Sequence, residues 1–463
     1  MDQEQDDYAA REPAVEERCR APFHWSKSIA QRAESGQSLP LRLLQTLIVR
    51  ELPAFVANNA SRKPDDLKSC AKIFVMILDA LEVNNFRNLS GKIFWGPGLN
   101  IIFGNNGQGK TNWLEAIHTL SRTKSFRTQR LQETIRFGQD SAFIEGQVSS
   151  GNDLHRDLRI TLRENTKAIW VNGKREQLAR YLGQLQVFAF TADQLEVVRG
   201  MPEARRHFID RGVASLRPAY VQTVSDYNKV IKQKNRILQD SQERELRLDE
   251  TENLIAPWNE QQVRLGAEIH RARVDYTEQL NRALERTLFE PAELQIRYLS
   301  SLETKGDLTD YERLLQERLQ LRLPAEMAAG RALIGPHRDD LGIHLGGRET
   351  RVYGSSGQQR SALLLLDLAA ISVYNSCHND FPLFLVDDVD AELDEKRIRR
   401  LLEYLEGRTQ TFITTSKRSH VAGFLSKANV HEIVGGEAVS AEVKENTFSA
   451  AAASAETLQD RSG

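Results

Sequence analysis

The fold is decided by one octapeptide, Gly104-Asn105-Asn106-Gly107-Gln108-Gly109-Lys110-Thr111, which matches the pattern G-x-x-x-x-G-K-[S/T]. It follows the apolar run Leu99–Phe103 and opens an expected helix over Asn112–Leu120, the setting that a phosphate-binding loop needs. Glycines let successive N–H groups turn inward around an anion, and the helix N-terminus adds the positive end of its dipole. Lys110 is expected to reach the β- and γ-phosphates, and the Thr111 hydroxyl to coordinate Mg²⁺. The octapeptide therefore indicates a nucleoside triphosphate site, with all eight residues as candidate ligands.

A second candidate element is the segment Phe384-Leu385-Val386-Asp387-Asp388, a short apolar strand that ends in two carboxylates. P-loop enzymes need an acid at the tip of a strand next to the P-loop strand to hold the Mg²⁺ shell, and Asp387 suits this role. Asp388 then stands where many such ATPases place a Glu that polarises the attacking water. Because Asp is one methylene shorter than Glu, we expect slow turnover. The alternative is that both aspartates cap the next helix.

A third element is the Ser/Gly-rich turn Gly354-Ser355-Ser356-Gly357-Gln358-Gln359-Arg360, which precedes an expected helix over Ser361–Tyr374. Such a turn can present an anion-binding helix N-terminus, although an ordinary helix cap is the alternative. The turn, the helix, the acidic strand and then Ala391-Glu392-Leu393-Asp394 follow one another in the order typical of ABC-type ATPase heads. Three residues of this signature turn are candidate nucleotide ligands: Ser355, Gly357 and Gln358.

Composition and charge exclude several classes of protein. The chain is 27% charged and 40% hydrophobic, enough for a substantial core, and its net charge of −2 means that a nucleic-acid partner needs a local basic patch. The three cysteines Cys19, Cys70 and Cys377 form no C-x-x-C pair, which argues against a zinc site and a disulfide framework. The apolar stretch Ala362–Tyr374 is too short to span a bilayer and contains Asp367. We expect a soluble, cytoplasmic protein without a membrane partner.

The chain is expected to form an α/β ATPase lobe that a helical insertion divides. The expected halves of this lobe are 76–200 and 329–434, and the charged, glycine-poor segment 201–328 is the helical lobe. Residues 1–75 are either a poorly ordered extension or a mis-assigned start, and 435–463 are an expected disordered tail. Apolar patterning and turn residues predict further strands in the first half: Ile77–Phe86, Lys92–Trp95, Ala142–Val148, Arg156–Leu162, Ala168–Val171 and Gln186–Phe190.

Several short motifs between about Met76 and Val434 resemble the RecF family of replication and recombinational repair proteins. The most specific are Gly335-Pro336-His337-Arg338-Asp339-Asp340 and Gly357-Gln358-Gln359-Arg360. Other stretches also resemble the family pattern: Asn85-Phe86-Arg87-Asn88, Gly98-Leu99-Asn100, Leu114-Glu115-Ala116-Ile117, Lys124-Ser125-Phe126-Arg127-Thr128 and Arg205-Arg206-His207-Phe208-Ile209-Asp210.

The resemblance implies an ABC-type P-loop ATPase head, related to SMC proteins, with a mixed sheet, flanking helices and an inserted helical lobe. It implies an ATP-dependent homodimer in which the signature turn of one protomer caps the γ-phosphate bound by the other. It further implies binding of single-stranded and gapped DNA, weak DNA-stimulated ATP hydrolysis, action with RecR and RecO, help in loading RecA, and a role in the SOS response. Arg87 is implied to reach the nucleotide phosphates, with a surface arginine as the alternative.

Rival interpretations remain at this point. About 120 helical residues are too few for the long coiled-coil arms of SMC proteins. An ATPase subunit of a transporter is the main alternative, disfavoured by the long helical insertion, and a nucleotide-binding protein without hydrolysis is another. Lys124, Arg127 and Arg130 suit either backbone phosphates or a solvated face. His337 either senses the γ-phosphate or anchors a turn.

Overall fold

The structure is a computed structural model, and it describes residues 74–150, 154–284 and 294–440. The predicted extension over residues 1–75 lies almost wholly outside the described residues, as does residue 441 onward of the predicted tail. Apart from the start of the tail, the domain boundaries drawn from the sequence stay a prediction.

A six-stranded sheet carries the P-loop, with the strand order β17-β16-β4-β15-β14-β9. Its first five strands in chain order run parallel, and β17 pairs antiparallel with β16 at the edge. All four residues of β14 are buried, as expected for a strand covered on both faces. The strands are β4 (Leu99–Phe103), β9 (Val187–Phe190), β14 (Leu383–Val386), β15 (Thr411–Thr415), β16 (Asn429–Val434) and β17 (Glu437–Ser440).

An antiparallel sheet with the order β3-β2-β5-β6-β7-β8 lies beside it. Its last hairpin turns at Asn172 and Gly173, whose φ values of 49° and 74° suit the type I′ turn that this pair favours. The strands are β2 (Ile77–Phe86), β3 (Leu89–Phe94), β5 (Ser141–Ser150), β6 (Leu154–Arg163), β7 (Thr166–Val171) and β8 (Lys174–Arg175).

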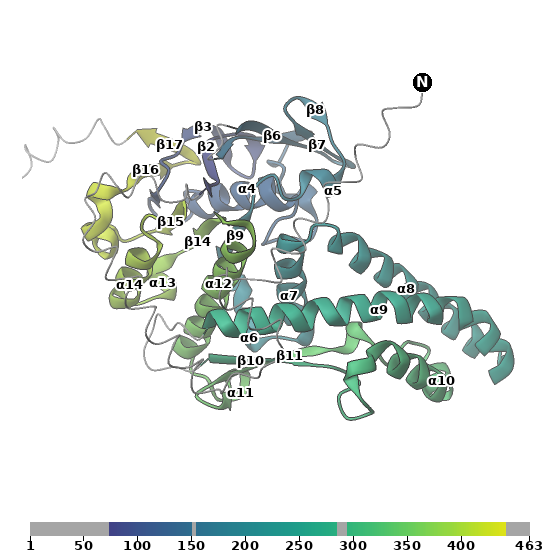
Figure 1. Ribbon diagram of the computed structural model, residues 1–463. Coiled ribbons are helices and arrows are strands. Elements are labelled where there is room, and N and C mark those ends of the chain that lie inside the picture. The colour runs from purple at the N-terminus through teal and green to yellow at the C-terminus, as the bar shows by residue number, and fades with distance from the viewer. Residues whose placement is uncertain (1–73, 151–153, 285–293, 441–463) are drawn as a thin grey trace, which may run out of the picture. The chain divides into compact units, whose positions relative to one another are not determined.

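Helix α4 (Lys110–Arg122), which the P-loop opens, packs between the two sheets (Figure 1). Alternate residues of β14 face opposite sides, as the two-residue period of a strand requires. Leu383 and Leu385 join the core around α4, whereas Phe384 and Val386 join the core around α12 (Ser356–His378). The two faces of one parallel sheet therefore hold the P-loop helix and the signature helix in fixed positions.

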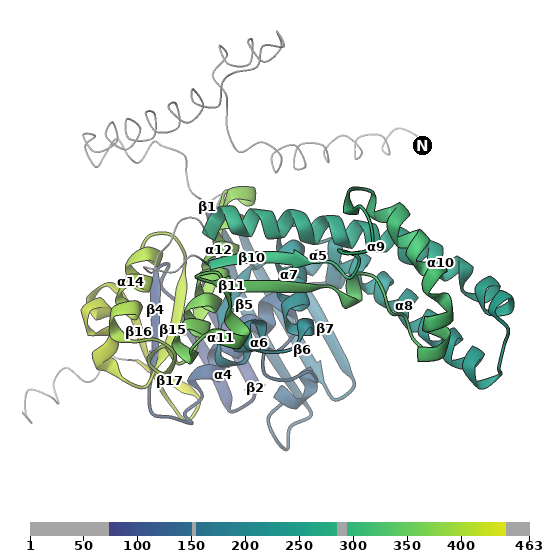
Figure 2. The same cartoon turned by 90° about the horizontal axis from the view of Figure 1, so that it is seen from below.

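The helical lobe contains α7 (Pro202–Leu216), α8 (Tyr220–Glu243), α9 (Leu248–Leu284) and α10 (Tyr311–Ala329). The long helices α8 and α9 lie side by side, with α10 against α9 (Figures 1 and 2). The expected all-helical segment also contains a strand, β10 (Leu294–Leu299), which pairs antiparallel with β11 (Asp340–Leu345). Strand β10 is short and lies within charged, helix-like sequence, so its alternation of buried and exposed residues could not be recognised from the sequence.

Two expectations about the second half are wrong in their bounds. The predicted tail began at residue 435, but Glu437–Ser440 form β17 because they complete the edge of the parallel sheet. The signature helix has 23 residues rather than the 14 of the expected Ser361–Tyr374, because it begins five residues earlier and ends four residues later. Among the described helices α12 alone is long and apolar enough to cross a membrane, yet 72% of its most apolar 18-residue window is buried in the protein, as in a core helix.

The remaining elements are short connections and edge pieces: β1 (Phe74–Val75), η3 (Leu131–Thr134), α5 (Leu178–Tyr181), η4 (Ala192–Leu195), α6 (Glu196–Arg199), η5 (Leu308–Asp310), η6 (Pro336–Arg338), β12 (Arg348–Glu349), α11 (Thr350–Tyr353), β13 (Asp380–Phe381), α13 (Val389–Glu392), α14 (Glu395–Leu405) and η7 (Arg418–Lys427).

One charged residue of α12 lies in the core. Asp367 is 2% exposed, and its Oδ2 has no hydrogen-bond partner in the part of the chain that the structure describes. It lines a small cavity together with His118, Arg122 and Arg211. Burial raises the pKa of Asp367 to about 8, while the nearby Arg211 opposes this shift. The carboxyl group is therefore largely protonated at neutral pH.

Asp367→Asn is expected to flatten the pH dependence of stability. Because the folded-state pKa of Asp367 is raised, its favourable contribution is complete below the unfolded pKa of about 4 and is lost as the pH rises toward 8. This loss is at most about 1.4 kcal/mol per pH unit. Urea unfolding at several pH values between about 5 and 8 should give a steeper fall for the wild type than for the variant. Parallel curves of unfolding free energy against pH for the two proteins would contradict the raised pKa of Asp367.

Candidate nucleotide-binding site

The P-loop joins β4 to α4 and owes its shape to its glycines. Gly104 and Gly109 have φ values of 152° and 105°, in the region that favours glycine. A Cβ atom at Gly104 would lie 2.6 Å from the carbonyl oxygen of Ile433 in β16, and one at Gly109 would lie 2.8 Å from Asn88 Oδ1. The loop is therefore held between β16 and the β2–β3 hairpin, so its backbone conformation is fixed by its neighbours.

Lys110 lies within the curve of this loop. Its side chain is buried, and Nζ donates hydrogen bonds to the carbonyl oxygens of Gly104 at 2.8 Å and Asn105 at 3.1 Å. An ammonium group has three protons, so these two bonds leave a third donor for an anion. Its predicted contact with the β- and γ-phosphates stays a prediction.

Thr111 and Asp387, far apart in the chain, meet at the end of the parallel sheet. Thr111 Oγ1 donates to Asp387 Oδ1 at 2.9 Å, and Thr414 Oγ1 donates to the same oxygen at 2.7 Å. Burial raises the pKa of Asp387, and the two hydroxyl donors oppose this shift. A hydroxyl beside a carboxylate is a set of hard oxygen donors that fits Mg²⁺.

The position of Asp387 in the sheet differs from the expected one. The sequence placed it on the strand next to the P-loop strand, but β15 lies between β4 and β14. Thr414 of this intervening strand spans the gap, and sequence reasoning missed it. The available signal was weak: a threonine near the end of an apolar strand, in Thr411-Phe412-Ile413-Thr414-Thr415.

Asp388 follows β14 in a left-handed conformation, with φ 46° and ψ 51°. Its N–H donates to Thr414 Oγ1 at 2.7 Å, which turns the chain sharply away from the strand. The residue stands at the N-cap of α13, yet within the described residues its side chain makes no capping hydrogen bond. Its carboxylate is exposed, so the structure does not favour the capping alternative for Asp388.

The signature turn forms a capping box at the start of α12. Ser355 Oγ accepts from the N–H of Gln358 at 3.3 Å, and Gln358 Oε1 accepts from the N–H of Ser355 at 2.8 Å. The helix therefore begins at Ser356, not Ser361, and the capping alternative is realised locally. Ser355 and Gln358 are nevertheless exposed, and Gly357 is half-buried in the first turn. Arg360 pairs with Glu392 of α13 at 2.7 Å, which ties the signature helix to the segment after Asp388.

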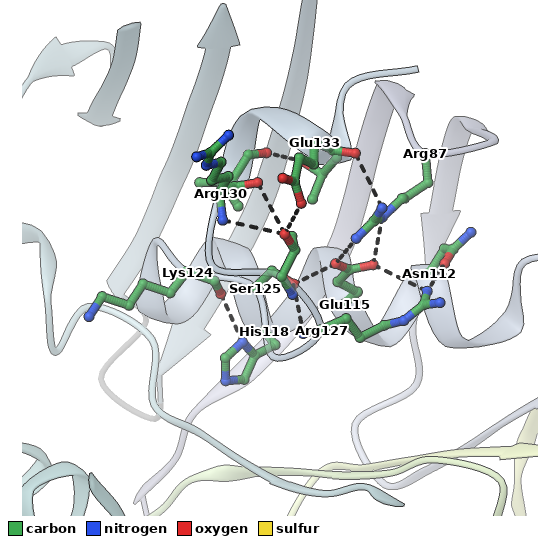
Figure 3. A network of polar contacts seen from close by, with 12 residues as sticks. Arg87, Asn112, Glu115, His118, Lys124, Ser125, Arg127, Arg130 and Glu133 are labelled. Atoms are coloured by element: carbon green, nitrogen blue, oxygen red, sulfur yellow. Dashed lines mark hydrogen bonds and ion pairs between the residues drawn. The ribbon is translucent and has the colours of Figure 1, made fainter. Parts of the chain in front are cut away.

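Arg87 lies at the start of the β2–β3 turn and points at α4 (Figure 3). Its Nε and Nη2 donate to Glu115 Oε2 at 3.0 Å and Oε1 at 2.8 Å, a bidentate pair with a buried carboxylate. Arg127 donates to Asn112 Oδ1 at 2.8 Å in the same network. Arg87 is therefore not a free surface arginine, and its expected contact with the nucleotide phosphates stays a prediction.

The other charged candidates take separate positions. Lys124 and Arg130 are exposed. His337 interacts with Tyr227 Oη at 2.8 Å, and burial lowers its pKa to about 4, so as a neutral ring it anchors its own turn to α8 of the helical lobe. Arg205 pairs with Asp340 at 2.6 Å, so its side chain has a structural partner within the protein.

Comparisons with known proteins agree with this geometry. The model of the RecF/RecN/SMC N-terminal domain matches residues 77–435. The DNA replication and repair protein RecF of Staphylococcus carnosus is 34% identical over 374 residues, covering 79% of this chain and 100% of the relative. RecF of Bacillus subtilis is 33% identical over 351 residues, covering 74% of this chain and 93% of the relative.

Solved structures give the same result for the fold. The recombination mediator protein RecF with ATP, described as part of the RecFOR pathway, superposes with a TM-score of 0.72 at 30% identity. The match covers 80% of this chain and 100% of that chain. The expected ABC-type P-loop ATPase head is thus confirmed, and the chain belongs to the RecF family.

Proposed function

We propose that this chain is an ATP-dependent DNA-binding protein of replication and recombinational repair, acting in the cytoplasm. ATP drives its dimerisation, the dimer holds single-stranded or gapped DNA, and slow DNA-stimulated hydrolysis resets it. The observation that carries the proposal is the meeting of the P-loop, Thr111 and Asp387 at one end of the parallel sheet. These three elements are what binding of a triphosphate with its metal requires.

The residues fit both ATP and Mg²⁺. The glycine-shaped loop presents N–H groups and the N-terminus of the thirteen-residue helix α4 to the phosphates, and Lys110 adds a point charge. Thr111 and Asp387 would hold Mg²⁺, which supplies charge neutralisation at the phosphates when bound. Asp388 is free to orient a water molecule, because its carboxylate is exposed and not used for capping.

Dimerisation is supported by the exposed signature turn. Ser355 and Ser356 at the start of α12 are exposed, so a second protomer can bring a γ-phosphate to the N-terminus of this helix. The relatives are named DNA replication and repair proteins, and the ATP-bound one is described as a recombination mediator in the RecFOR pathway. By this family membership we propose RecR and RecO as partners, help in loading RecA, and a part in SOS induction.

Sedimentation velocity tests this function directly. The full chain is compared with ATP, with ADP and without nucleotide, each with and without gapped DNA. A dimer that needs ATP and binds DNA is the expected result. A monomer under all six conditions, or DNA binding that ignores nucleotide, would overturn the proposal.

Ser355→Arg is expected to leave ATP binding by the monomer intact and to block ATP-dependent dimerisation. The arginine would fill the surface meant for the partner's γ-phosphate, and it would remove the hydroxyl of the capping box. Ser355→Asn is the matched control, because Asn also caps helices well and adds no bulk of that size. ATP titration and sedimentation of both variants provide the measurement. If the arginine variant still forms the ATP dimer, the signature turn does not cap the partner's nucleotide.

A further inference from the structure

A buried carboxylate on α4 is the centre of a polar network (Figure 3). Glu115 has a fully buried side chain, and it receives the bidentate pair from Arg87. Ser125 Oγ donates to Glu115 Oε1 at 2.6 Å and in turn accepts from the N–H of Arg127 at 2.9 Å. Glu115 therefore fixes both an arginine of the β2–β3 hairpin and the turn that follows α4.

The same network reaches the P-loop through two asparagines. Asn88 Nδ2 donates to the carbonyl oxygen of Gln108 in the P-loop at 3.3 Å, and Asn112 Nδ2 donates to Asn88 Oδ1 at 2.7 Å. Arg127 Nη1 then donates to Asn112 Oδ1 at 2.8 Å and lies 3.6 Å from Glu115 Oε2. Hydrogen bonds thus connect a backbone carbonyl of the nucleotide loop with an arginine at the surface.

The charged groups around Glu115 give the adjacent protein surface a net positive charge. A single buried carboxylate faces two guanidinium groups, and the side chains of Arg87 and Arg127 that carry them are 24% and 43% exposed. Lys124 and Arg130 are exposed on the same turn segment, whereas Glu133, which bonds Thr128, is the acidic group beside them. Segment 124–130 is therefore a small basic surface, and the buried Glu115 on α4 fixes its position.

We propose that Glu115 is a positioning residue that couples the nucleotide loop to this basic surface, where Arg127, Lys124 and Arg130 contact the phosphates of a nucleic-acid backbone. A shift of the P-loop at Gln108 moves Asn88 and Asn112, and these change the direction of Arg127. By reciprocity, a phosphate that holds Arg127 favours one state of the loop. This inference rests on the proposed function and explains how the bound nucleotide could change the affinity for DNA.

Glu115→Gln is expected to weaken this coupling. Glutamine has nearly the same shape and keeps one oxygen for Ser125, but it loses the charge that pairs with Arg87 and Arg127. The measurement is the affinity for labelled single-stranded DNA with ATP and with ADP, at several salt concentrations. We expect the ratio of the two affinities to fall by about 5-fold or more. The salt slope should fall by about one unit, as for one lost phosphate contact.

The double variant separates positioning from general stability. Arg127→Gln changes an exposed side chain and should lower the ratio to a similar extent, and adding it to Glu115→Gln should cause little further loss. The control is Glu326→Gln, because Glu326 is also fully buried and pairs at 2.7 Å with a buried lysine, Lys234, in the helical lobe. This control should keep the wild-type ratio and salt slope.

The outcomes are distinguishable. A wild type whose DNA affinity ignores nucleotide overturns the proposed function itself. A nucleotide-dependent wild type with an unchanged ratio in both Glu115→Gln and Arg127→Gln overturns the coupling role alone. Strictly additive losses in the double variant also overturn it, because Glu115 would then not act through Arg127. If Glu115→Gln does not fold, an unchanged ratio of the two DNA affinities in Arg127→Gln alone overturns the coupling role.

Discussion

ATP binding is expected to fail in Lys110→Met. The ammonium is the point charge that the P-loop offers to the phosphates, and methionine replaces it with an uncharged chain of similar length. Removing one partner of a buried, hydrogen-bonded charge pair costs about 2–5 kcal/mol, which is roughly 30-fold to several thousand-fold in affinity. Titration calorimetry with ATP and Mg²⁺ provides the measurement, and wild-type affinity in the variant would refute the P-loop assignment.

The variant must also be shown to keep its fold. Methionine cannot donate to the carbonyl oxygens of Gly104 and Asn105, so these two bonds are lost as well. The loop is still held by its contacts with β16 and Asn88, and we expect its backbone to persist. Lys229→Met is a suitable control, since Lys229 is an exposed lysine of α8 paired with Asp226. It should bind ATP as the wild type does.

The local pattern around the P-loop was sufficient to predict its structure. Strand β4 has the predicted bounds, Leu99–Phe103, and the helix after the loop differs only by two residues at each end. Both follow from short-range physics: an apolar run, glycines at positive φ and a helix N-terminus. The order of motifs along the chain then gave the ABC-type head, which the fold confirms.

The parts that could not be predicted depend on contacts between distant segments. Nothing in the chain around Thr414 shows that β15 enters between β4 and β14, so its bonds to Asp387 and Asp388 became evident only from the sheet order. Strand β10 was missed because its partner β11 lies beyond α10 in the sequence. Pairing partners of this kind are set by tertiary packing, not by local propensity.

Glu115 is an intermediate case. In the sequence its motif shows only a family likeness, yet a glutamate between Leu114 and Ala116 on an apolar helix is itself a signal. Carboxylates are rarely buried unless they are paired, so the sequence called for a cationic partner. Which arginines supply the pairing could not be predicted, because Arg87 and Arg127 come from two different turns.

The largest effect on catalysis is expected for Asp388→Asn, which should stop hydrolysis while ATP and DNA remain bound. The group that orients the attacking water is lost, whereas Thr111 and Asp387 keep their places. Asparagine is well suited to this position, because it tolerates the left-handed φ of 46° better than other residues do. The backbone N–H can still donate to Thr414, so the turn after β14 should be unchanged.

Loss of a general base typically costs about 10²–10⁴-fold in rate, so the variant should be nearly inert. The wild type should itself be slow, well below the enzyme median of about 10 s⁻¹, because a short aspartate stands where a glutamate would reach further. Steady-state hydrolysis and the dwell time on gapped DNA are measured for the wild type, Asp388→Asn and the surface control Asp226→Asn. Equal rates would remove Asp388 from catalysis. If Asp388→Asn hydrolyses ATP more slowly than the wild type but stays on DNA for the same time, hydrolysis does not release the DNA. The lifetime of the ATP-bound dimer would then not determine how long the protein remains on gapped DNA.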